Sequence, residues 1–296
     1  KRFYLKKEVQ SMIIDAYKYV LDFLKLYTRD RTRAKKELDM YFYEHSDFLS
    51  AFYNHYLGIS INEAKARFLE NARKFNFIEL ENKINDVYPV ILQVANKVTE
   101  EMKIKPNIYL FIDNWEVNAL TVITTGKKTA VGVALENVNK DNIGLILAHE
   151  ICHQVFVQRV LEENPEIRNY QELFEFLDLA DMLLFEGLAA IYTKLVYPDK
   201  ELHELIFSTK EMIKCCEEHE EEILNFTLND LGNKGIETYI RHFTNKSPIC
   251  SRHGHYIAYK MVNTLLEHGF SWRELCYNWK GKDLVRKYLD IMSSNR

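Results

Sequence analysis

The sequence predicts an α+β protein that is mostly helical, with a small β-sheet packed against a helix that carries a metal-binding motif. Three observations lead to this class. Apolar residues recur at three- and four-residue spacing through most of the chain. Three short segments rich in β-branched and aromatic residues interrupt that pattern between residues 107 and 136. An apolar stretch over residues 141–162 then contains the motif His-Glu-x-x-His.

The composition is that of an ordinary globular protein. The chain has 296 residues, and 47% of them are hydrophobic, which is ample for a packed core. A net charge of −4, from 39 basic and 43 acidic side chains, gives no reason to expect binding to nucleic acid or to a membrane surface. No signal peptide or transmembrane stretch is visible, so we expect a cytoplasmic protein.

The five cysteines form neither a disulfide framework nor a thiolate zinc motif. They are an odd number and contain no Cys-x-x-Cys pair. We therefore expect all five to be reduced thiols, which favours a reducing compartment. The positions are Cys152, Cys215, Cys216, Cys250 and Cys276.

Residues 1–104 are expected to form an N-terminal helical segment. The helical pattern is nearly continuous over residues 7–105, where Gly58 and Pro89 are the only strong breakers. The segment is also rich in aromatic residues, which predict either a helical packing unit or a wall that receives an extended peptide. These residues are Tyr41, Phe42, Tyr43, Phe48, Phe52, Tyr53 and Tyr56.

Three strands are expected at 107–113, 119–124 and 129–135, with a turn at Gly126 between the last two. The third strand leads directly into the motif helix, so the sheet and the helix should pack together. We expect an extended peptide substrate to pair with residues 129–137, which makes Ala134 and Glu136 candidate substrate-binding residues.

The motif helix carries the candidate metal ligands. His149 and His153 are four residues apart, so both imidazoles lie on one helical face and can share a tetrahedral zinc ion. Glu150 is rotated by about 100° from the first ligand, where it can act on a metal-bound water. Histidines embedded among Leu, Ile, Val and Phe need a polar partner, and a metal ion is one.

Glu186 is the candidate third ligand. It is a single carboxylate in an apolar helical segment, and the following Gly187 allows another backbone to approach closely. The alternative is a buried acid paired with a basic side chain. Among the competing acids, Asp178 and Asp181 have apolar neighbours, whereas the others lie in charged surroundings: Glu162, Glu163, Glu166, Glu172 and Glu175.

A polar loop over residues 244–256 precedes an apolar helix near the C-terminus. Arg252, His253, His255 and Tyr256 cluster there, which predicts either groups that hold a developing oxyanion or a substrate carboxylate, or an ordinary capping loop. The other histidines, His219 among them, lack ligand spacing, and the acidic run at 216–222 is expected to be a solvated helix face.

These motifs together resemble the gluzincin-type zincin metallopeptidases, and more closely the bacterial predicted zinc-dependent proteases. The resemblance covers about residues 105–280 and rests on Ala148-His149-Glu150-Ile151-Cys152-His153, on Glu186-Gly187-Leu188-Ala189 and on Gly254-His255-Tyr256. It implies a zincin-like catalytic domain over residues 105–296, made of sheet 107–136, metal helix 141–162 and a helical part at 166–296.

The resemblance also implies residue roles. His149, His153 and Glu186 would bind zinc, Glu150 would be the general base, and Tyr256, or else His255 or His253, would stabilise the oxyanion. Independently of the resemblance, the polar loop makes Arg252 a candidate to bind a substrate carboxylate. Ala190 stands where gluzincins often carry an acid that orients a zinc-binding histidine.

The expected function is therefore zinc-dependent hydrolysis of peptide bonds in a peptide or protein substrate. Two alternatives remain open: a zinc hydrolase of a non-peptide substrate, and a non-catalytic helical interaction or regulatory protein with a residual metal site. A purely structural zinc would need four protein ligands and no base, so the intact Glu150 favours an enzyme.

Overall fold

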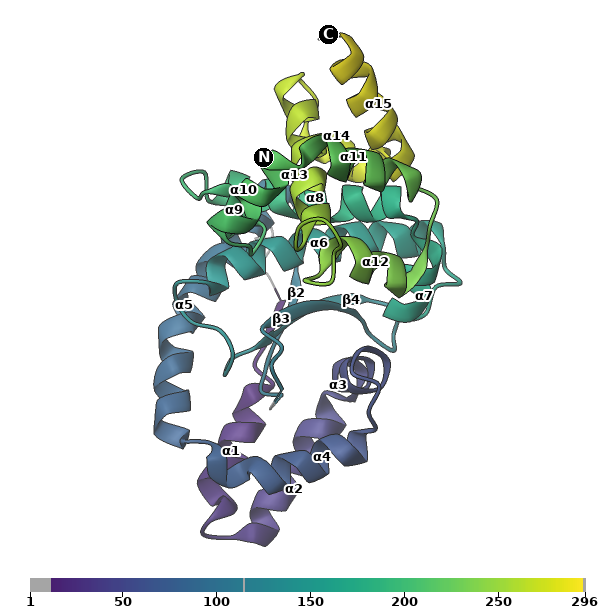
Figure 1. Cartoon of the computed structure of the whole chain (residues 1–296). Coiled ribbons are helices and arrows are strands. Elements are labelled where there is room, and N and C mark those ends of the chain that lie inside the picture. Colours follow the sequence, from purple (N-terminus) through teal and green to yellow (C-terminus); the bar gives the residue numbers. More distant parts are fainter. Residues whose placement is uncertain (1–11, 114, 295–296) are drawn as a thin grey trace, which may run out of the picture. The chain divides into compact units, whose positions relative to one another are not determined.

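The computed structural model confirms a mostly helical protein with one small sheet (Figure 1). It describes residues 12–113 and 115–294, and the chain forms two compact units, Lys1–Gln154 and Val155–Arg296. The division falls inside helix α6 (Ile143–Glu163), which covers the predicted metal helix. The domain boundary expected after residue 104 stays a prediction.

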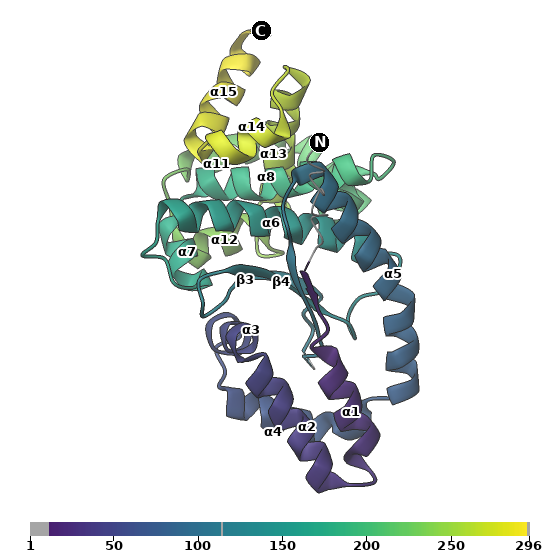
Figure 2. The ribbon, with the colours of Figure 1, turned by 180° about the vertical axis from the view of Figure 1, so that it is seen from behind.

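The first unit contains helices that precede and surround a mixed sheet. Helices α1 (Tyr17–Tyr27) and α2 (Arg31–Glu44) lie side by side in both views (Figures 1 and 2). Its other elements are the strands β1 (Met12–Ile14), β2 (Asn107–Phe111), β3 (Ala119–Ile123) and β4 (Thr129–Ala134), and the helices α3 (Ser46–Ser50), η1 (Ala51–Tyr56), α4 (Ile61–Asn71), η2 (Ala72–Lys74) and α5 (Phe77–Met102).

The sheet has the order β1-β2-β4-β3, and the three predicted strands are β2, β3 and β4. β1 and β4 run parallel to β2, whereas β3 runs antiparallel to β4. β1 is a correction, because residues 12–14 were expected to be helical. Three residues are too few for apolar spacing to separate strand from helix, and pairing with Asn107–Tyr109 decides the outcome.

Pro89 does not break its helix, which is a second correction. Helix α5 runs through it, although proline removes one main-chain hydrogen bond at a cost of about 3 kcal/mol. Val87, Ile91 and Val94 are buried on one face of the same helix. Each contributes on the order of 1.5–3 kcal/mol on burial, so the packing of this face outweighs the lost bond.

The aromatic residues of the N-terminal segment are mainly core. Phe48 stacks on Tyr109 of β2 with ring centroids 4.5 Å apart, and a Cβ on Gly132 of β4 would lie 2.5 Å from the Phe48 ring. Tyr41, Phe42, Phe52 and Tyr53 are also buried, whereas Tyr43 and Tyr56 are exposed by 74% and 48%. This supports a packing unit rather than a peptide-binding wall.

The second unit is helical. α8 and α13 are its most closely packed helices, and Gly187 explains why, because a Cβ there would lie 2.5 Å from the Ala258 carbonyl oxygen. The close backbone approach predicted at Gly187 is thus confirmed. The helices after α6 are α7 (Tyr170–Phe176), α8 (Leu179–Val196), α9 (Leu202–Leu205), α10 (Lys210–Glu218), α11 (Glu220–Asn229), α12 (Gly235–Phe243), α13 (His253–Glu267), α14 (Trp272–Asn278) and α15 (Gly281–Ser294).

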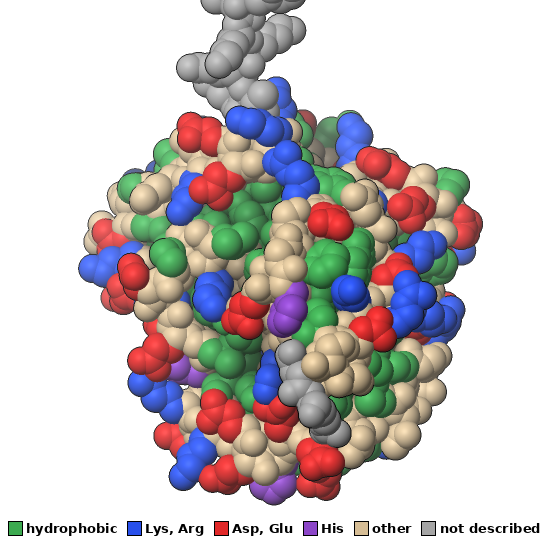
Figure 3. Space-filling view, turned by 90° about the horizontal axis from the view of Figure 1, so that it is seen from above, with side chains coloured by type: hydrophobic (Ala, Val, Ile, Leu, Met, Phe, Trp, Pro, Cys, Tyr) green, Lys and Arg blue, Asp and Glu red, His purple; other side chains and the backbone are tan. Residues whose placement is uncertain are grey.

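The helices of the described residues lack the length and apolar composition that crossing a bilayer requires. On the face seen in Figure 3, acidic and basic side chains are interspersed with apolar ones.

Candidate metal centre

Helix α6 brings His149, Glu150 and His153 together as their spacing predicts. One donor atom from each residue lies within 4.8 Å of the other two, so the three can hold a metal ion. The two imidazole centroids are 4.5 Å apart with the rings nearly perpendicular, at 89°. Both histidines are only 5% exposed, whereas Glu150 is partly exposed. Two buried imidazoles beside a more accessible carboxylate are a possible donor set for a metal ion.

Side-chain hydrogen bonds join the sheet directly to this helix. Thr121 of β3 donates its hydroxyl hydrogen toward Glu150, with the Oγ1 atom 2.8 Å from the main-chain carbonyl oxygen and 3.0 Å from Oε2. Gln154 donates from Nε2 to the Thr129 carbonyl of β4 at 2.9 Å. Glu150 is therefore oriented by the sheet. The sequence analysis did not identify Thr121 as a site residue. The feature that could have indicated it is a single hydroxyl group in an otherwise apolar strand.

Tyr56 is a second residue that sequence reasoning did not place at this site. It ends the π-helical turn η1, which packs against β3, and its ring stacks on Phe52 with centroids 6.1 Å apart. Burial and the nearby negative charge of Glu150 raise the pKa of the Tyr56 phenol, so the group stays protonated at neutral pH and can donate a hydrogen bond. π-Helical turns are frequent at functional sites.

The predicted pairing of substrate with residues 129–137 needs correction. Strand β4 lies between β2 and β3, and it is hydrogen-bonded on both sides, so it offers no open edge. Ala134 forms part of these ladders. The edge strand on this side, among the described residues, is β3.

Glu136, which follows β4, is paired with Asp113, which follows β2. Its Oε1 accepts a hydrogen bond from the Asp113 amide at 2.7 Å. Burial and the charge of Glu136 raise the pKa of the fully buried Asp113 to about 9, so Asp113 carries a proton at neutral pH. This contact ties Glu136 to the segment after β2, and its role in substrate binding stays a prediction.

Glu186 lies on α8 in the second unit and is 2% exposed. Tyr239 donates its hydroxyl to Oε1 at 3.0 Å, and His255 Nε2 lies 3.4 Å from Oε2. Burial and the charge of Glu186 raise the pKa of Tyr239 well above its usual value. A tyrosine and a histidine thus hold this carboxylate. Its membership in the metal site of the first unit stays a prediction.

The competing acids on the same helix have other partners. Asp178 caps the N-terminus of α8, where Oδ1 accepts from the Asp181 amide at 3.1 Å and Oδ2 lies 3.3 Å from Lys282. Asp181 accepts a hydrogen bond from the Gly281 amide at 2.9 Å. These contacts tie both acids to the local packing of α8 and α15.

The polar residues at the start of α13 divide into groups with different partners. His255 lies beside Glu186, with Arg252 Nη2 3.2 Å from its Nε2 atom. His253 is completely buried, and its two ring nitrogens lie 3.1 Å from His242 Nδ1 and 3.2 Å from the Cys250 carbonyl. Burial and His242 lower the pKa of His253 to about 4, so it is neutral at pH 7. His253 thus lies between two local partners, and an oxyanion role for it stays a prediction.

Tyr256 points its hydroxyl to Glu220 of α11, with the two oxygens 3.0 Å apart, and Lys260 pairs with the same carboxylate. Burial and Glu220 raise the pKa of Tyr256. The predicted oxyanion donor therefore has a local partner in the second unit, and its catalytic role stays a prediction.

The expectation of five reduced thiols is wrong for two of them. Cys215 and Cys250 form a disulfide, and the free thiols of Cys152, Cys216 and Cys276 are buried. Thirty-five residues separate the two half-cystines, so their meeting depends on the packing of α10 against the segment before α13 and cannot be derived from spacing.

No family model matches the chain, and no curated protein or solved structure matches it either. The resemblance to gluzincins therefore rests on the residues quoted above and on the metal-binding arrangement of α6.

Proposed function

We propose that the protein is a zinc-dependent peptidase in which His149 and His153 bind the metal ion and Glu150 is the general base. The observation that carries the proposal is the set of donor atoms from these three residues, all within 4.8 Å of one another on one buried helix. Nitrogen donors from two imidazoles with a nearby carboxylate fit zinc. Glu186, the buried carboxylate of α8, is the proposed third ligand.

Zinc, when bound, would supply Lewis acidity that activates a water molecule and polarises the substrate carbonyl group. The protein's own residues do the proton transfer. Glu150 takes a proton from the attacking water and gives it to the leaving amine, a role that contributes about 10²–10⁴-fold. The Thr121 hydroxyl limits the rotation of this carboxylate and so restricts the orientation from which it takes the proton.

Glu186 is suited to ligation because its orientation is already restricted. Tyr239 and His255 contact different oxygens of the carboxylate. Partners of this kind orient metal ligands and raise their affinity, and their loss typically weakens metal binding 10- to 100-fold. In this scheme His255 is a positioning residue.

We assign the oxyanion donor to Tyr56 in preference to Tyr256. The turn that carries Tyr56 packs on the strand that binds Glu150, and the side chain is half exposed. The Tyr256 hydroxyl is bonded to Glu220 instead. A neutral phenol that donates to the charge developing on the substrate oxygen lowers the barrier mainly in the transition state.

The decisive test is zinc content after dialysis, measured on the whole chain and on single variants. We expect about one ion at this site in the wild type and a large loss in His149→Ala, His153→Ala and Glu186→Ala. His268→Ala, at an exposed helix end, is the control and should retain zinc. Full retention in Glu186→Ala would remove that residue from the site.

Activity separates the peptidase from its two alternatives. Glu150→Gln should retain zinc but cleave an unbiased peptide library at least about 10²-fold more slowly than the wild type. A zinc-loaded wild type that leaves the library intact but hydrolyses ester or amide compounds would indicate a non-peptide hydrolase. Absence of both activities from the zinc-loaded wild type would favour a non-catalytic protein.

A further inference from the structure

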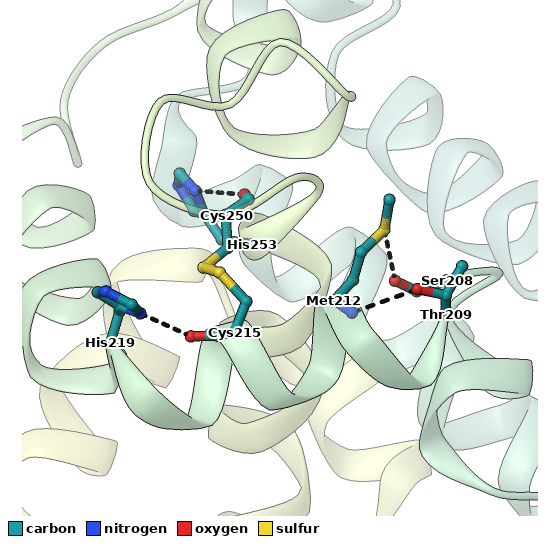
Figure 4. Close-up of a disulfide and its surroundings, with 7 residues drawn as sticks. All are labelled: Ser208, Thr209, Met212, Cys215, His219, Cys250 and His253. Atoms are coloured by element: carbon teal, nitrogen blue, oxygen red, sulfur yellow. Dashed lines mark hydrogen bonds between the residues drawn. A yellow bond between two sulfur atoms is a disulfide. The ribbon is translucent and has the colours of Figure 1, made fainter.

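The disulfide between Cys215 and Cys250 joins helix α10 to the segment before α13 (Figure 4). Cys250 is buried and Cys215 is half-buried, whereas the neighbouring His219 is exposed. One donor atom from each of these three residues lies within 4.8 Å of the other two. Two sulfurs and an imidazole nitrogen at such distances are a donor set for a soft or borderline metal ion.

The chain brings the three residues together at the C-terminal end of α10. Cys215 lies in the last turns of this helix, His219 follows its last residue, and Cys250 approaches from another part of the chain. His219 Nδ1 lies 3.0 Å from the Cys215 carbonyl oxygen. A neutral imidazole that donates to a carbonyl keeps a lone pair on its other nitrogen, which is the form of histidine that binds metals.

We propose that Cys215, Cys250 and His219 form a second metal site, for zinc or a similar divalent cation, when the disulfide is reduced. A dithiol reductant supplies two electrons and two protons, closes its own disulfide and leaves two thiols on the protein. Metal binding then displaces the two thiol protons. The oxidised and metal-bound states are alternatives, because the same two sulfurs serve both.

The distances permit this change with a small adjustment. Zinc–sulfur bonds of about 2.3 Å at tetrahedral angles place two thiolates about 3.8 Å apart. The ligand atoms already lie within 4.8 Å, and the Cα atoms of the two cysteines are 6.1 Å apart. Water would complete a fourth position, since the exposed His219 leaves this side of the site open.

The surroundings favour a bound cation. Residues Glu217–Glu222 supply a run of carboxylates around His219, and three of them line a surface depression beside it: Glu218, Glu221 and Glu222. Negative charge nearby disfavours bare thiolates but stabilises a divalent ion that they bind. The acidic run, expected to be only a solvated helix face, would then attract the metal.

The site has a structural consequence for the segment that follows Cys250. The Cys250 carbonyl lies 3.2 Å from His253 Nδ1, and Arg252, in the left-handed conformation, leads into α13. His255, three residues after Arg252, contacts Glu186. Either the disulfide or the metal would fix the start of this segment.

The test uses the full chain and Co²⁺ as the probe. Protein is reduced with dithiothreitol, freed of it by anaerobic gel filtration and titrated with Co²⁺. We expect a thiolate-to-cobalt charge-transfer band in the near ultraviolet from the reduced protein and none from the oxidised protein. His149 and His153 offer no sulfur, so the band reports the second site alone, and the double variant His149→Ala/His153→Ala should retain it.

Variants identify the ligands. Cys215→Ser and Cys250→Ser should abolish the band, and His219→Gln, which leaves the disulfide intact, should weaken cobalt affinity at least about tenfold. Cys216→Ser changes the adjacent buried thiol and should leave the band unchanged. A reduced wild type without the band, or a Cys215→Ser variant with the full band, would overturn the proposal, and the disulfide would then be structural only.

Discussion

The Thr121 hydroxyl donates a hydrogen bond to Glu150, with its oxygen 3.0 Å from the carboxylate Oε2 and 2.8 Å from the main-chain carbonyl of the same residue. A side chain of the sheet thus fixes both the backbone and the carboxylate of the proposed base. Because the contact does not involve His149 or His153, it can be removed without removing either of these proposed ligands.

Thr121→Val should therefore retain zinc while kcat falls about tenfold and KM changes little. A hydrogen bond to a charged group stabilises by about 1.5–3 kcal/mol. In the variant, water that hydrogen-bonds to the Glu150 carboxylate replaces part of this energy. Steady-state kinetics with zinc analysis checks this. Thr99→Val, which removes another buried hydroxyl of the first unit, is the matched control. Equal kinetic loss in both variants would indicate a general effect on stability.

Tyr56→Phe should lower kcat at least about tenfold with little change in KM, because the lost hydrogen bond exists mainly in the transition state. Tyr256→Phe is the comparison. It should lower the melting temperature by a few degrees through loss of the Glu220 contact and leave kcat near normal. The opposite pattern, with kcat lost only in Tyr256→Phe, would return the oxyanion role to Tyr256.

Asp113 should make the protein less stable as the pH rises. The pKa of Asp113 is about 9 in the folded protein, against an ordinary value of 3.8. Between pH 3.8 and about pH 9, the folded state therefore holds a proton that the unfolded state has released. Stability from this group is complete below about pH 4 and is lost progressively up to about pH 9. Asp113→Asn, which imitates the protonated acid, should remove this trend.

Urea unfolding at about pH 5 and about pH 8 measures the effect, and we expect the free energy of unfolding to fall by about 1–3 kcal/mol more in the wild type than in Asp113→Asn. Asp199→Asn, at an exposed position, should behave like the wild type. Identical pH dependence in Asp113→Asn and the wild type would contradict a protonated Asp113.

Gly187→Ala should destabilise the protein by about 1–3 kcal/mol. The added Cβ would lie 2.5 Å from the Ala258 carbonyl oxygen, and overpacking at such a contact exceeds the gain of about 1 kcal/mol in helix propensity. Gly232→Ala, where a Cβ meets nothing within 4 Å, is the control. Chemical denaturation of both variants checks the difference, and an unchanged or higher stability of Gly187→Ala would contradict the close approach of α8 and α13.

Local patterns were sufficient for the parts of the molecule that depend on neighbours in sequence. The three strands at 107–135, the helix around the motif and the shared face of His149 and His153 follow from periods of 2 and 3.6 residues. Gly187 likewise indicated a close backbone contact, because glycine destabilises the interior of a helix and lets another backbone approach where a Cβ would collide.

The remaining features depend on partners that lie far away in the chain. Residues 12–14 became a strand through pairing with β2, β4 became an interior strand, and most of the N-terminal aromatic residues became core. Thr121 and Tyr56 lie near Glu150 only because β3 packs on α6 and η1 packs on β3. Cys215 meets Cys250 across 35 residues.

The sequence by itself determined which side chains share a helical face or a strand, since backbone geometry sets those positions. Only the tertiary structure decided which of these faces meet, because burial of apolar surface depends on contacts between distant segments and not on the order of residues within one of them.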